Sequence, residues 1–206
     1  NNFDNRKVIV HARNASFDIA EALGVTHFVQ LDDDYYFFGF RGADGAKTIR
    51  RMDSVFEDVL DFLDSTPTLS IAFAQGGDSI GGFAGVKMKR KAMNSFFCRT
   101  DRRFTFLGSI NEDVNTYVVE GTRGGLFFTF TGLQLDQKDT QSQGGGMTDV
   151  YLQRGTYVKS FTSVLFNPSA VRVSMMSTKH ARMHHTIDWG ATCPKIVPHH
   201  IRRLDA

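Results

Sequence analysis

Long apolar runs, a Gly-rich phosphate loop and a signal-like start are all missing from this sequence, and each absence excludes a class of protein. No stretch approaches the roughly 20 consecutive apolar residues of a membrane helix. The first residues lack the charged-then-apolar layout of a secretory signal. No GxxxxGKS or GxxxxGKT loop is present, which argues against a P-loop enzyme. We therefore expect a cytoplasmic protein without membrane contact.

Cysteine is scarce. The two cysteines, Cys98 and Cys193, lie far apart and match no metal or redox spacing. We expect both to be buried free thiols in a reducing compartment. A disulfide-built scaffold is thereby excluded.

An excess of charge of one sign is also absent. The chain has 24 Lys and Arg against 22 Asp and Glu, and the net charge of +2 excludes an extreme polyelectrolyte. Basic residues nevertheless cluster at 87–91 (KMKRK), at 99–103 (RTDRR) and at Arg202 and Arg203. These clusters could bind phosphates or could simply be solvated surface.

The length and composition fit one compact domain. The chain has 206 residues, of which 41% are hydrophobic, and no linker or repeat divides it, so we expect a single domain over 1–206. A strand is predicted at 7–11 (KVIVH) and a helix at 16–23, capped by Ser16 and closed by Gly24. A second strand follows at 26–31 (THFVQL). Such a strand-helix-strand unit predicts parallel pairing with a right-handed crossover.

Further elements extend this α/β pattern. Helices are expected at 52–63 and over most of 148–166, and strands at 69–73, 94–98, 104–107, 126–130 and 171–176. A glycine-rich turn at 75–82 is expected near the active face. The predicted fold class is α/β, with a mostly parallel, Rossmann-like central sheet flanked by helices.

Three consecutive carboxylates, Asp32, Asp33 and Asp34, directly follow a predicted strand. Ligands gather at the C-terminal ends of strands in open α/β sheets. A divalent cation is the natural partner of such a group, and oxygen ligands favour Mg²⁺ or Mn²⁺. The alternative is a solvated acidic turn or a set of helix caps.

The segments HARN (11–14), AEALG (20–24) and LDDDY (31–35) resemble the middle of a GT-A glycosyltransferase. The resemblance implies that Asp32 and Asp34 form a DxD pair, with Asp34 the direct ligand of a cation that bridges the donor diphosphate. It also implies that Arg13, Asn14 and Asp33 contribute to the nucleotide site. The alternative for Arg13 is an ordinary surface contact at the helix entry.

INEDV (110–114) resembles the xED motif of inverting GT-A enzymes. The resemblance implies that Asp113 is the base that takes the acceptor proton and that Glu112 is its helper. The alternative is that Asn111 caps a helix whose dipole both acids complement.

Later residues complete the predicted site. Many GT-A enzymes close the metal site with a late histidine, which makes His184 and His185 candidates. Because neighbouring side chains on an extended segment point in opposite directions, one of them at most should be a ligand. Both could instead be structural. Trp189 could stack on the sugar or base, or belong to the core. Gly81 and Gly82 are expected to contact the acceptor.

Among GT-A proteins, the sequence most resembles the TET-associated glycosyltransferases of bacteriophages. The resemblance rests on HARNASFDIAEALG (11–24), LDDDYYFF (31–38), SINEDVNTY (109–117) and RMHHTIDW (182–189). It implies sugar transfer from a nucleotide sugar, with UDP-sugar expected, to a hydroxymethylated pyrimidine in DNA, in the host cytoplasm for a phage protein. Only residues 1–6 precede the first predicted strand, so the nucleotide-binding portion is expected to be short or missing.

Three alternatives stay open. The acceptor could be a glycan, lipid or protein, with the chemistry unchanged. The chain could be a non-catalytic module that binds nucleotide or nucleic acid. It could also be a nucleotidyltransferase, which uses strand-end carboxylates and Mg²⁺ but releases pyrophosphate.

Overall fold

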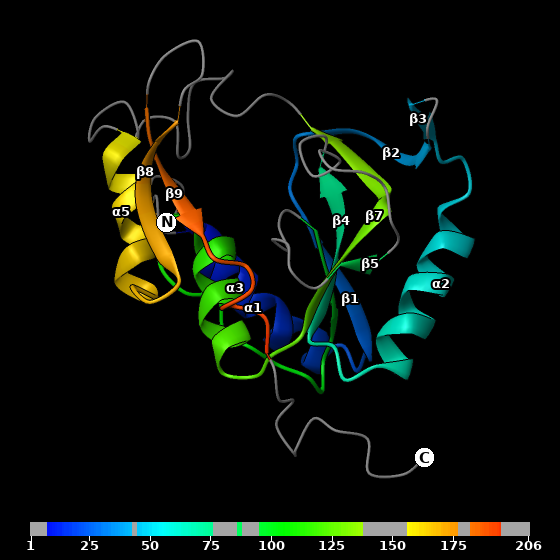
Figure 1. Cartoon of the computed structure of the whole chain (residues 1–206). Coiled ribbons are helices and arrows are strands. Elements are labelled where there is room, and N and C mark those ends of the chain that lie inside the picture. Colours follow the sequence, from blue (N-terminus) through cyan, green and yellow to red (C-terminus); the bar gives the residue numbers. More distant parts are fainter. Residues whose placement is uncertain are drawn as a thin grey trace.

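The computed structural model describes residues 8–42, 45–75, 86–87, 95–137, 156–176 and 182–194. Figure 1 shows a central sheet with α2 (Met52–Ser65) on one side and α1 (Val8–Ala22) and α3 (Glu112–Thr122) on the other. Beyond α3 lie α5 (Thr156–Phe166) and a two-stranded sheet. No helix that the structure describes is long and apolar enough to cross a membrane.

The central sheet is mixed and mainly antiparallel. Its strands are β1 (His27–Leu31), β2 (Tyr35–Gly42), β3 (Gly45–Thr48), β4 (Ser70–Gln75), β5 (Val86–Lys87), β6 (Ser95–Arg99) and β7 (Phe127–Gln137). They follow the order β1-β6-β4-β7-β2-β3, and β5 also pairs with β7. Among the described strands, β4 and β7 form the one parallel pair. The expected mostly parallel sheet is therefore not confirmed, although the α/β class is.

The predicted strand at 7–11 is wrong, because α1 begins at Val8 and runs through it. Val10, Arg13, Phe17 and Ala20 are all buried. Their spacing of three and four residues places them on one helical face, and this packing overrides the strand preference of the β-branched run. Without a first strand there is no strand-helix-strand unit, so β1 lies at the edge of the sheet and pairs antiparallel with β6.

The ends of α1 match the prediction in part. Ser16 lies inside the helix, where its hydroxyl donates to the carbonyl of Ala12 at 2.9 Å, so it is not the N-cap. Gly24 does close the helix, because it has φ +66° and donates its N–H to the carbonyl of Glu21 at 3.0 Å. Glycine reaches this left-handed conformation without steric cost.

Other elements lie near their predicted places. The helix at 52–63 is confirmed as α2, and the strands at 69–73, 94–98 and 126–130 are confirmed as β4, β6 and the first part of β7. The strand at 171–176 is confirmed as β8 (Val171–Met176), which pairs with an unpredicted β9 (Arg182–Ile187). The described part of the helix at 148–166 is α5.

The strand predicted at 104–107 does not form. The Asn14 side chain takes both backbone groups of Phe106: its Nδ2 donates to the carbonyl at 3.1 Å, and its Oδ1 accepts the N–H at 2.8 Å. The N–H of Leu107 donates to the Thr116 hydroxyl at 2.9 Å. Side chains of α1 and α3 therefore satisfy the backbone that a neighbouring strand would otherwise pair.

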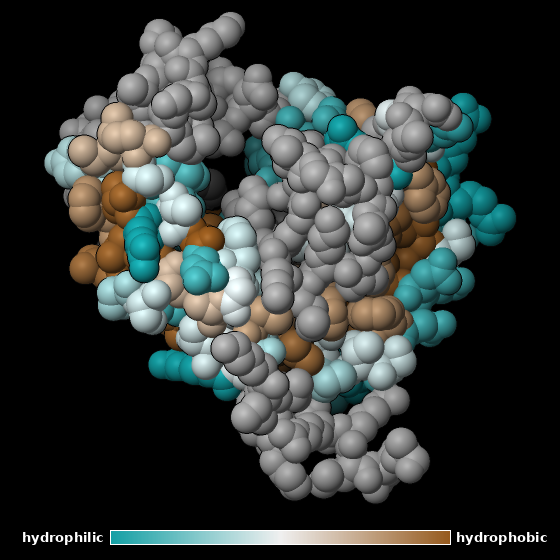
Figure 2. Space-filling view, in the orientation of Figure 1, coloured by the Kyte–Doolittle hydropathy of each residue, from teal (hydrophilic) through white to brown (hydrophobic). Residues whose placement is uncertain are grey.

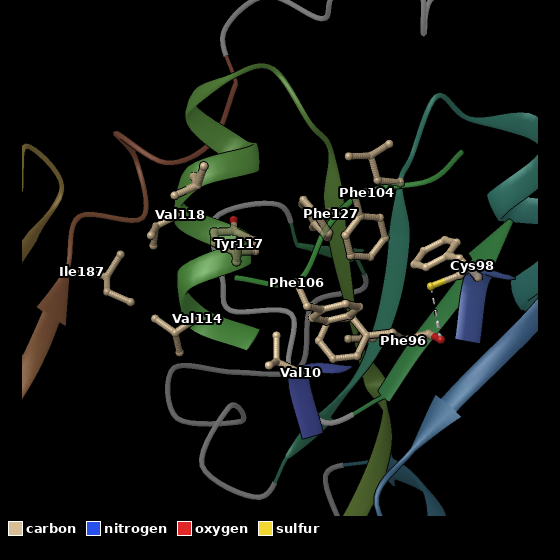
Figure 3. Close-up of a cluster of buried hydrophobic side chains, with 14 of the residues drawn as sticks. Val10, Phe96, Cys98, Phe104, Phe106, Val114, Tyr117, Val118, Phe127 and Ile187 are labelled. Carbon is tan, nitrogen blue, oxygen red and sulfur yellow. Dashed lines mark hydrogen bonds between the residues drawn. The ribbon is translucent and has the colours of Figure 1, made fainter. Parts of the chain in front are cut away.

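Two apolar clusters hold the helices on the sheet. The α2 cluster joins Val55, Val59 and Leu63 to Ile71, Phe73, Phe97 and Leu135. The α1–α3 cluster includes Val10, Phe17, Val114, Tyr117, Val118, Phe96, Cys98, Phe104, Phe106, Phe127 and Ile187 (Figure 3). On β6, Phe97 faces α2 while Phe96 and Cys98 face α1 and α3, as the two-residue period of a strand requires.

The α5–β8–β9 unit is attached through α3. Val171 and Ile187 are buried in the α1–α3 cluster. A Cβ added to Gly121 of α3 would lie 2.0 Å from the carbonyl oxygen of Thr192, so this approach requires glycine. Figure 2 shows hydrophobic residues at the surface over α5, where Phe161 and Leu165 are exposed, and hydrophilic residues along the outer side of α2.

Candidate active site

The acidic turn, Asp32–Asp34, connects β1 to β2 at one end of the central sheet. Two other elements meet it there: the middle of α1, which supplies Arg13, and the start of α3, which supplies Glu112 and Asp113. The structure therefore brings most of the predicted site residues together from segments up to 99 residues apart.

Arg13 links the acidic turn to the start of α3. Its Nη2 donates to Asp32 Oδ1 at 2.8 Å, and its Nε donates to Glu112 Oε1 at 3.1 Å. Its side chain is only 5% exposed, and its guanidinium lies 5.2 Å from the ring centre of Phe96 and 5.6 Å from that of Phe106. A buried guanidinium with two carboxylates fixes the relative positions of α1, the acidic turn and α3.

Carboxylates outnumber this cation. Burial raises the pKa of Asp32, and the charges of Asp113 and Asp34 raise it further, although Arg13 opposes them. Burial and the charge of Asp113 raise the pKa of Glu112 to about 7, again against Arg13. Burial opposes the charged form of Arg13 too, but Asp32, Glu112 and Asp113 together raise its pKa. The cluster is thus rich in negative charge around one fixed positive group.

Asp34 is held differently. Both of its carboxylate oxygens accept from Nε2 of Gln137, each at 2.9 Å. Gln137 is the last residue of β7 and pairs with Tyr35. Its own Oε1 accepts from Nε2 of Gln75, the last residue of β4, at 2.7 Å. The partner of the Asp34 carboxylate is therefore a neutral amide, that of Gln137, which the end of β4 holds in turn.

Asp113 lies at the N-terminus of α3, is only 8% exposed, and accepts the backbone N–H of Val114 at 2.7 Å. Asn111, just before the helix, has the left-handed conformation φ 54°, ψ 42° and makes no side-chain cap bond. Its Nδ2 donates instead to the Lys159 carbonyl at 2.8 Å and to the Ser163 hydroxyl at 3.1 Å. The side-chain cap expected from Asn111 is therefore absent, and the residue instead fixes the start of α3 against α5. Glu112 and Asp113 do lie in the first turn of α3, where they complement the helix dipole, as that alternative expects.

The other residues predicted for the nucleotide site have varied surroundings. The Asn14 amide is occupied by the Phe106 backbone on both sides. The backbone N–H of Asp32 donates to the Tyr35 hydroxyl at 3.2 Å, which closes the acidic turn. Asp33 is exposed. The nucleotide contacts predicted for Arg13, Asn14 and Asp33 stay predictions.

His184 and His185 lie on β9, and their rings are stacked with centroids 4.4 Å apart and an angle of 28°. The expectation that the two rings point in opposite directions is therefore wrong. Two-stranded ribbons twist more than wide sheets, which allows long neighbouring side chains to turn toward each other. The strand is tied to α5, since the Ser160 hydroxyl donates to the Met183 carbonyl at 3.0 Å.

Trp189 packs edge-to-face on Tyr117, with ring centroids 5.3 Å apart and an angle of 74°. This contact places it against the α1–α3 cluster, in agreement with the core alternative. Gly81 and Gly82, predicted to contact the acceptor, lie outside the described residues.

The described residues contain no group of three or more His, Cys, Asp or Glu side chains placed to hold a metal ion. The acidic turn and the two histidines therefore do not form a complete protein cage for a cation in the part of the chain that the structure describes. The arrangement can supply two carboxylates from the turn and a buried carboxyl pair at the start of α3.

Both cysteines are buried free thiols, as predicted. The basic cluster at 99–103 is occupied by contacts within the protein. Arg99 contacts Asp64 and Asp101, Arg102 donates to the carbonyls of Leu63, Thr66 and Thr68, and Arg103 contacts Asp18. These arginines stabilise loops at the other end of β1 from the acidic turn. The rest of the basic clusters, apart from Lys87, lies outside the described residues.

Sequence reasoning missed Gln137, and it placed Gln75 only in the glycine-rich turn expected near the active face. Each is a polar residue at the end of an apolar strand, and only the pairing of β4 with β7 brings them together. It also missed Tyr36, which follows the acidic turn closely and is 64% exposed. The aromatic pair in LDDDYY was the available signal for that residue.

A family model described as TET-Associated Glycosyltransferase matches residues 1–146, well over half of the chain. The match contains Arg13, the acidic turn, Glu112, Asp113 and Gln137, but not the residues of β9. No curated protein and no solved structure matches the chain.

Proposed function

Since this chain belongs to the TET-associated glycosyltransferase family, we propose that it transfers a sugar from a nucleotide-sugar donor to a hydroxymethylated pyrimidine in DNA. The proposal includes dependence on Mn²⁺ or Mg²⁺, a UDP-sugar donor and inversion at the sugar carbon. The acidic turn binds the nucleotide-sugar donor, and Asp113 takes the proton of the acceptor hydroxyl.

The observation that carries the proposal is the double ion pair of Arg13. The guanidinium lies 2.8 Å from Asp32 Oδ1 and 3.1 Å from Glu112 Oε1, and so it holds the acidic turn beside the start of α3. Sugar transfer needs a site for the leaving diphosphate and a base for the acceptor within reach of one sugar carbon. Two acidic motifs far apart in sequence meet this requirement only when they lie together.

The residues fit a divalent cation that is shared with the donor. The cluster has one buried guanidinium against four carboxyl groups, those of Asp32, Asp34, Glu112 and Asp113. Mg²⁺ is commonly bound through one or two carboxylates together with substrate phosphates and water. Asp34 and Asp32 would hold the ion, and when bound it would neutralise the charge that develops on the departing diphosphate.

The protein's own groups perform the remaining steps. Asp113 accepts the proton of the acceptor hydroxyl, whose oxygen forms a bond to the anomeric carbon of the sugar. The bond from that carbon to the diphosphate oxygen breaks, and the nucleoside diphosphate leaves with the electron pair. Arg13 keeps Glu112 beside Asp113, so the carboxyl pair stays fixed as charge moves.

The DNA acceptor is supported by the family and by one exposed aromatic residue. A base inside a duplex must leave the stack before its substituent can react. Tyr36 is 64% exposed and lies two residues after Asp34, where a flipped or flanking base could stack on it. We assign Tyr36 to the acceptor side of the site.

The test is a transfer assay with UDP- and GDP-sugars and Mn²⁺ or Mg²⁺. The acceptors are duplex DNA containing 5-hydroxymethylcytosine or 5-hydroxymethyluracil, with unmodified DNA and EDTA as controls. Mass spectrometry of the nucleosides should detect a sugar only on the hydroxymethylated base and only with metal.

Other results separate the alternatives. Donor turnover without DNA modification would keep the glycosyltransferase and reject the DNA acceptor. Release of pyrophosphate would indicate a nucleotidyltransferase. Intact donor under every condition, with nucleotide or DNA still bound, would indicate a binding module.

A further inference from the structure

The two outer carboxylates of the acidic turn have different partners. Asp32 contacts the buried guanidinium of Arg13 at 2.8 Å. Asp34 accepts two hydrogen bonds at 2.9 Å from the amide of Gln137. A guanidinium compensates the charge of its carboxylate, whereas an amide orients a carboxylate and leaves its charge unchanged.

The direction of the Gln137 amide is fixed from both sides. A carboxylate can only accept, so the NH₂ group of Gln137 must face Asp34. Its carbonyl oxygen then faces away and accepts from Gln75 Nε2 at 2.7 Å. Gln75 and Gln137 end neighbouring parallel strands, so the sheet itself sets the separation of the two amides.

We propose that Gln137, oriented by Gln75, is a positioning residue that presents the carboxylate of Asp34 to a divalent cation. Among the described residues, no cationic side chain forms an ion pair with Asp34. Asp32, whose charge Arg13 compensates, would then be the weaker of the two ligands proposed above. This assignment rests on the metal dependence in the proposed function. Outer hydrogen-bond partners of a metal ligand typically change metal affinity by about 10- to 100-fold.

The proposal is tested by titrating the full chain with Mn²⁺ alone. The electron paramagnetic resonance signal of the free ion measures how much Mn²⁺ is bound. Gln137→Met keeps the length of the side chain and removes the donor. Gln75→Met keeps the donor and removes its orienting partner. Gln134→Met is the matched control, because Gln134 lies on the same strand but accepts from Arg41 at 2.6 Å. Thermal unfolding of each variant shows whether the chain remains folded.

We expect the Kd for Mn²⁺ to rise by about 10-fold in Gln137→Met and by a smaller factor in Gln75→Met. The double variant should be no weaker than Gln137→Met, because the two amides act as one unit. Gln134→Met should bind as the wild type does. If Gln137→Met does not fold, the shift in Gln75→Met decides the question.

Unchanged affinity in both Gln137→Met and Gln75→Met, while Asp34→Asn abolishes binding, would overturn this assignment and leave the metal site intact. An equal loss in Gln134→Met would overturn it as well, because the effect would then be a general one on β7. A wild-type chain that binds no Mn²⁺ on its own would also overturn this assignment, because Asp34 would then not present a cation site without the donor. The metal dependence itself is tested separately by the transfer assay with EDTA.

Discussion

Two ion-pair networks lie at the two ends of β1, and they differ in burial and in the direction of their carboxyl pKa shifts. At the end of the strand, Asp32 and Glu112 surround Arg13, whose side chain is 5% exposed. At its start, Asp64 contacts His27 at 2.7 Å and also contacts Arg99, with the Asp64 side chain 41% exposed. Both networks pair an arginine with carboxylates, and the network at the start of β1 also contains His27, so composition alone does not explain their difference.

Burial distinguishes them. Burial raises the pKa of Asp32 and Glu112, so these carboxyl groups resist ionisation despite Arg13. Burial also opposes ionisation of Asp64, but hydrogen bonds from His27 and Arg99 prevail and lower its pKa. Buried ionisable groups whose pKa values are raised against a charged partner are typical of functional sites. An exposed ion pair that water screens is typical of a surface contact.

The largest effect is expected from Asp113→Asn. The variant should lose about 10²- to 10⁴-fold in transfer rate, because the amide cannot accept the acceptor proton. Donor affinity, measured by calorimetry, should stay near the wild-type value, because Asp113 does not hold the diphosphate. Loss of donor binding instead would make Asp113 a structural residue of α3.

Arg13→Met should have the largest effect on stability. Removing one partner of a buried ion pair leaves uncompensated charge inside the protein and typically costs about 3–5 kcal/mol. Urea unfolding at pH 8 measures this loss. The loss should shrink at pH 5, where the raised pKa of Glu112 favours its neutral form. A loss below about 1 kcal/mol would contradict the role of Arg13 as the central connection.

The two ends of β1 should respond to pH in opposite directions. The folded pKa of Glu112 is about 7, above its ordinary 4.5, so the folded chain binds more protons and stability falls as pH rises through this window. The folded pKa of Asp64 lies below its ordinary 3.8, so its contribution is lost as pH falls below that value. Unfolding across pH should show the first slope flattened in Glu112→Gln and the second in Asp64→Asn. Unchanged slopes would contradict the assignment.

The smallest effect is expected from Asp64→Asn at neutral pH. An ion-pair partner this exposed contributes less than about 1 kcal/mol, because water screens it. Urea unfolding should therefore give a loss several times smaller than that of Arg13→Met. Equal losses would show that burial is not what separates the two networks.

The local elements that carry the candidate site were visible in the sequence because they depend on local pattern. The strand into Asp32 and the helix after Asn111 follow from apolar residues next to acidic ones. The ion pair that joins these two elements was not visible, because Arg13 and Glu112 are 99 residues apart and no local rule pairs them. The same limit applies to Gln137, whose partners come from β4 and from the acidic turn.

The pairing of the strands in the central sheet was not predicted from the sequence. The run Val8–Val10 favours a strand by propensity, but the helical spacing of Val10, Arg13 and Phe17 was the stronger signal, because it buries one face. That error produced the expectation of a strand-helix-strand unit with parallel pairing. At 104–107, side chains of α1 and α3 bind the backbone, which no strand pattern in the sequence could indicate.

The most direct measurement compares Asp34→Asn with Asp64→Asn in the transfer assay on hydroxymethylated DNA. Both variants replace one carboxylate with an amide, at opposite ends of β1. We predict at least a ~100-fold loss of transfer for Asp34→Asn and a wild-type rate for Asp64→Asn, with both variants folded. A wild-type rate in Asp34→Asn, or an equal loss in both variants, would contradict the assignment of the acidic turn as the catalytic end of the sheet.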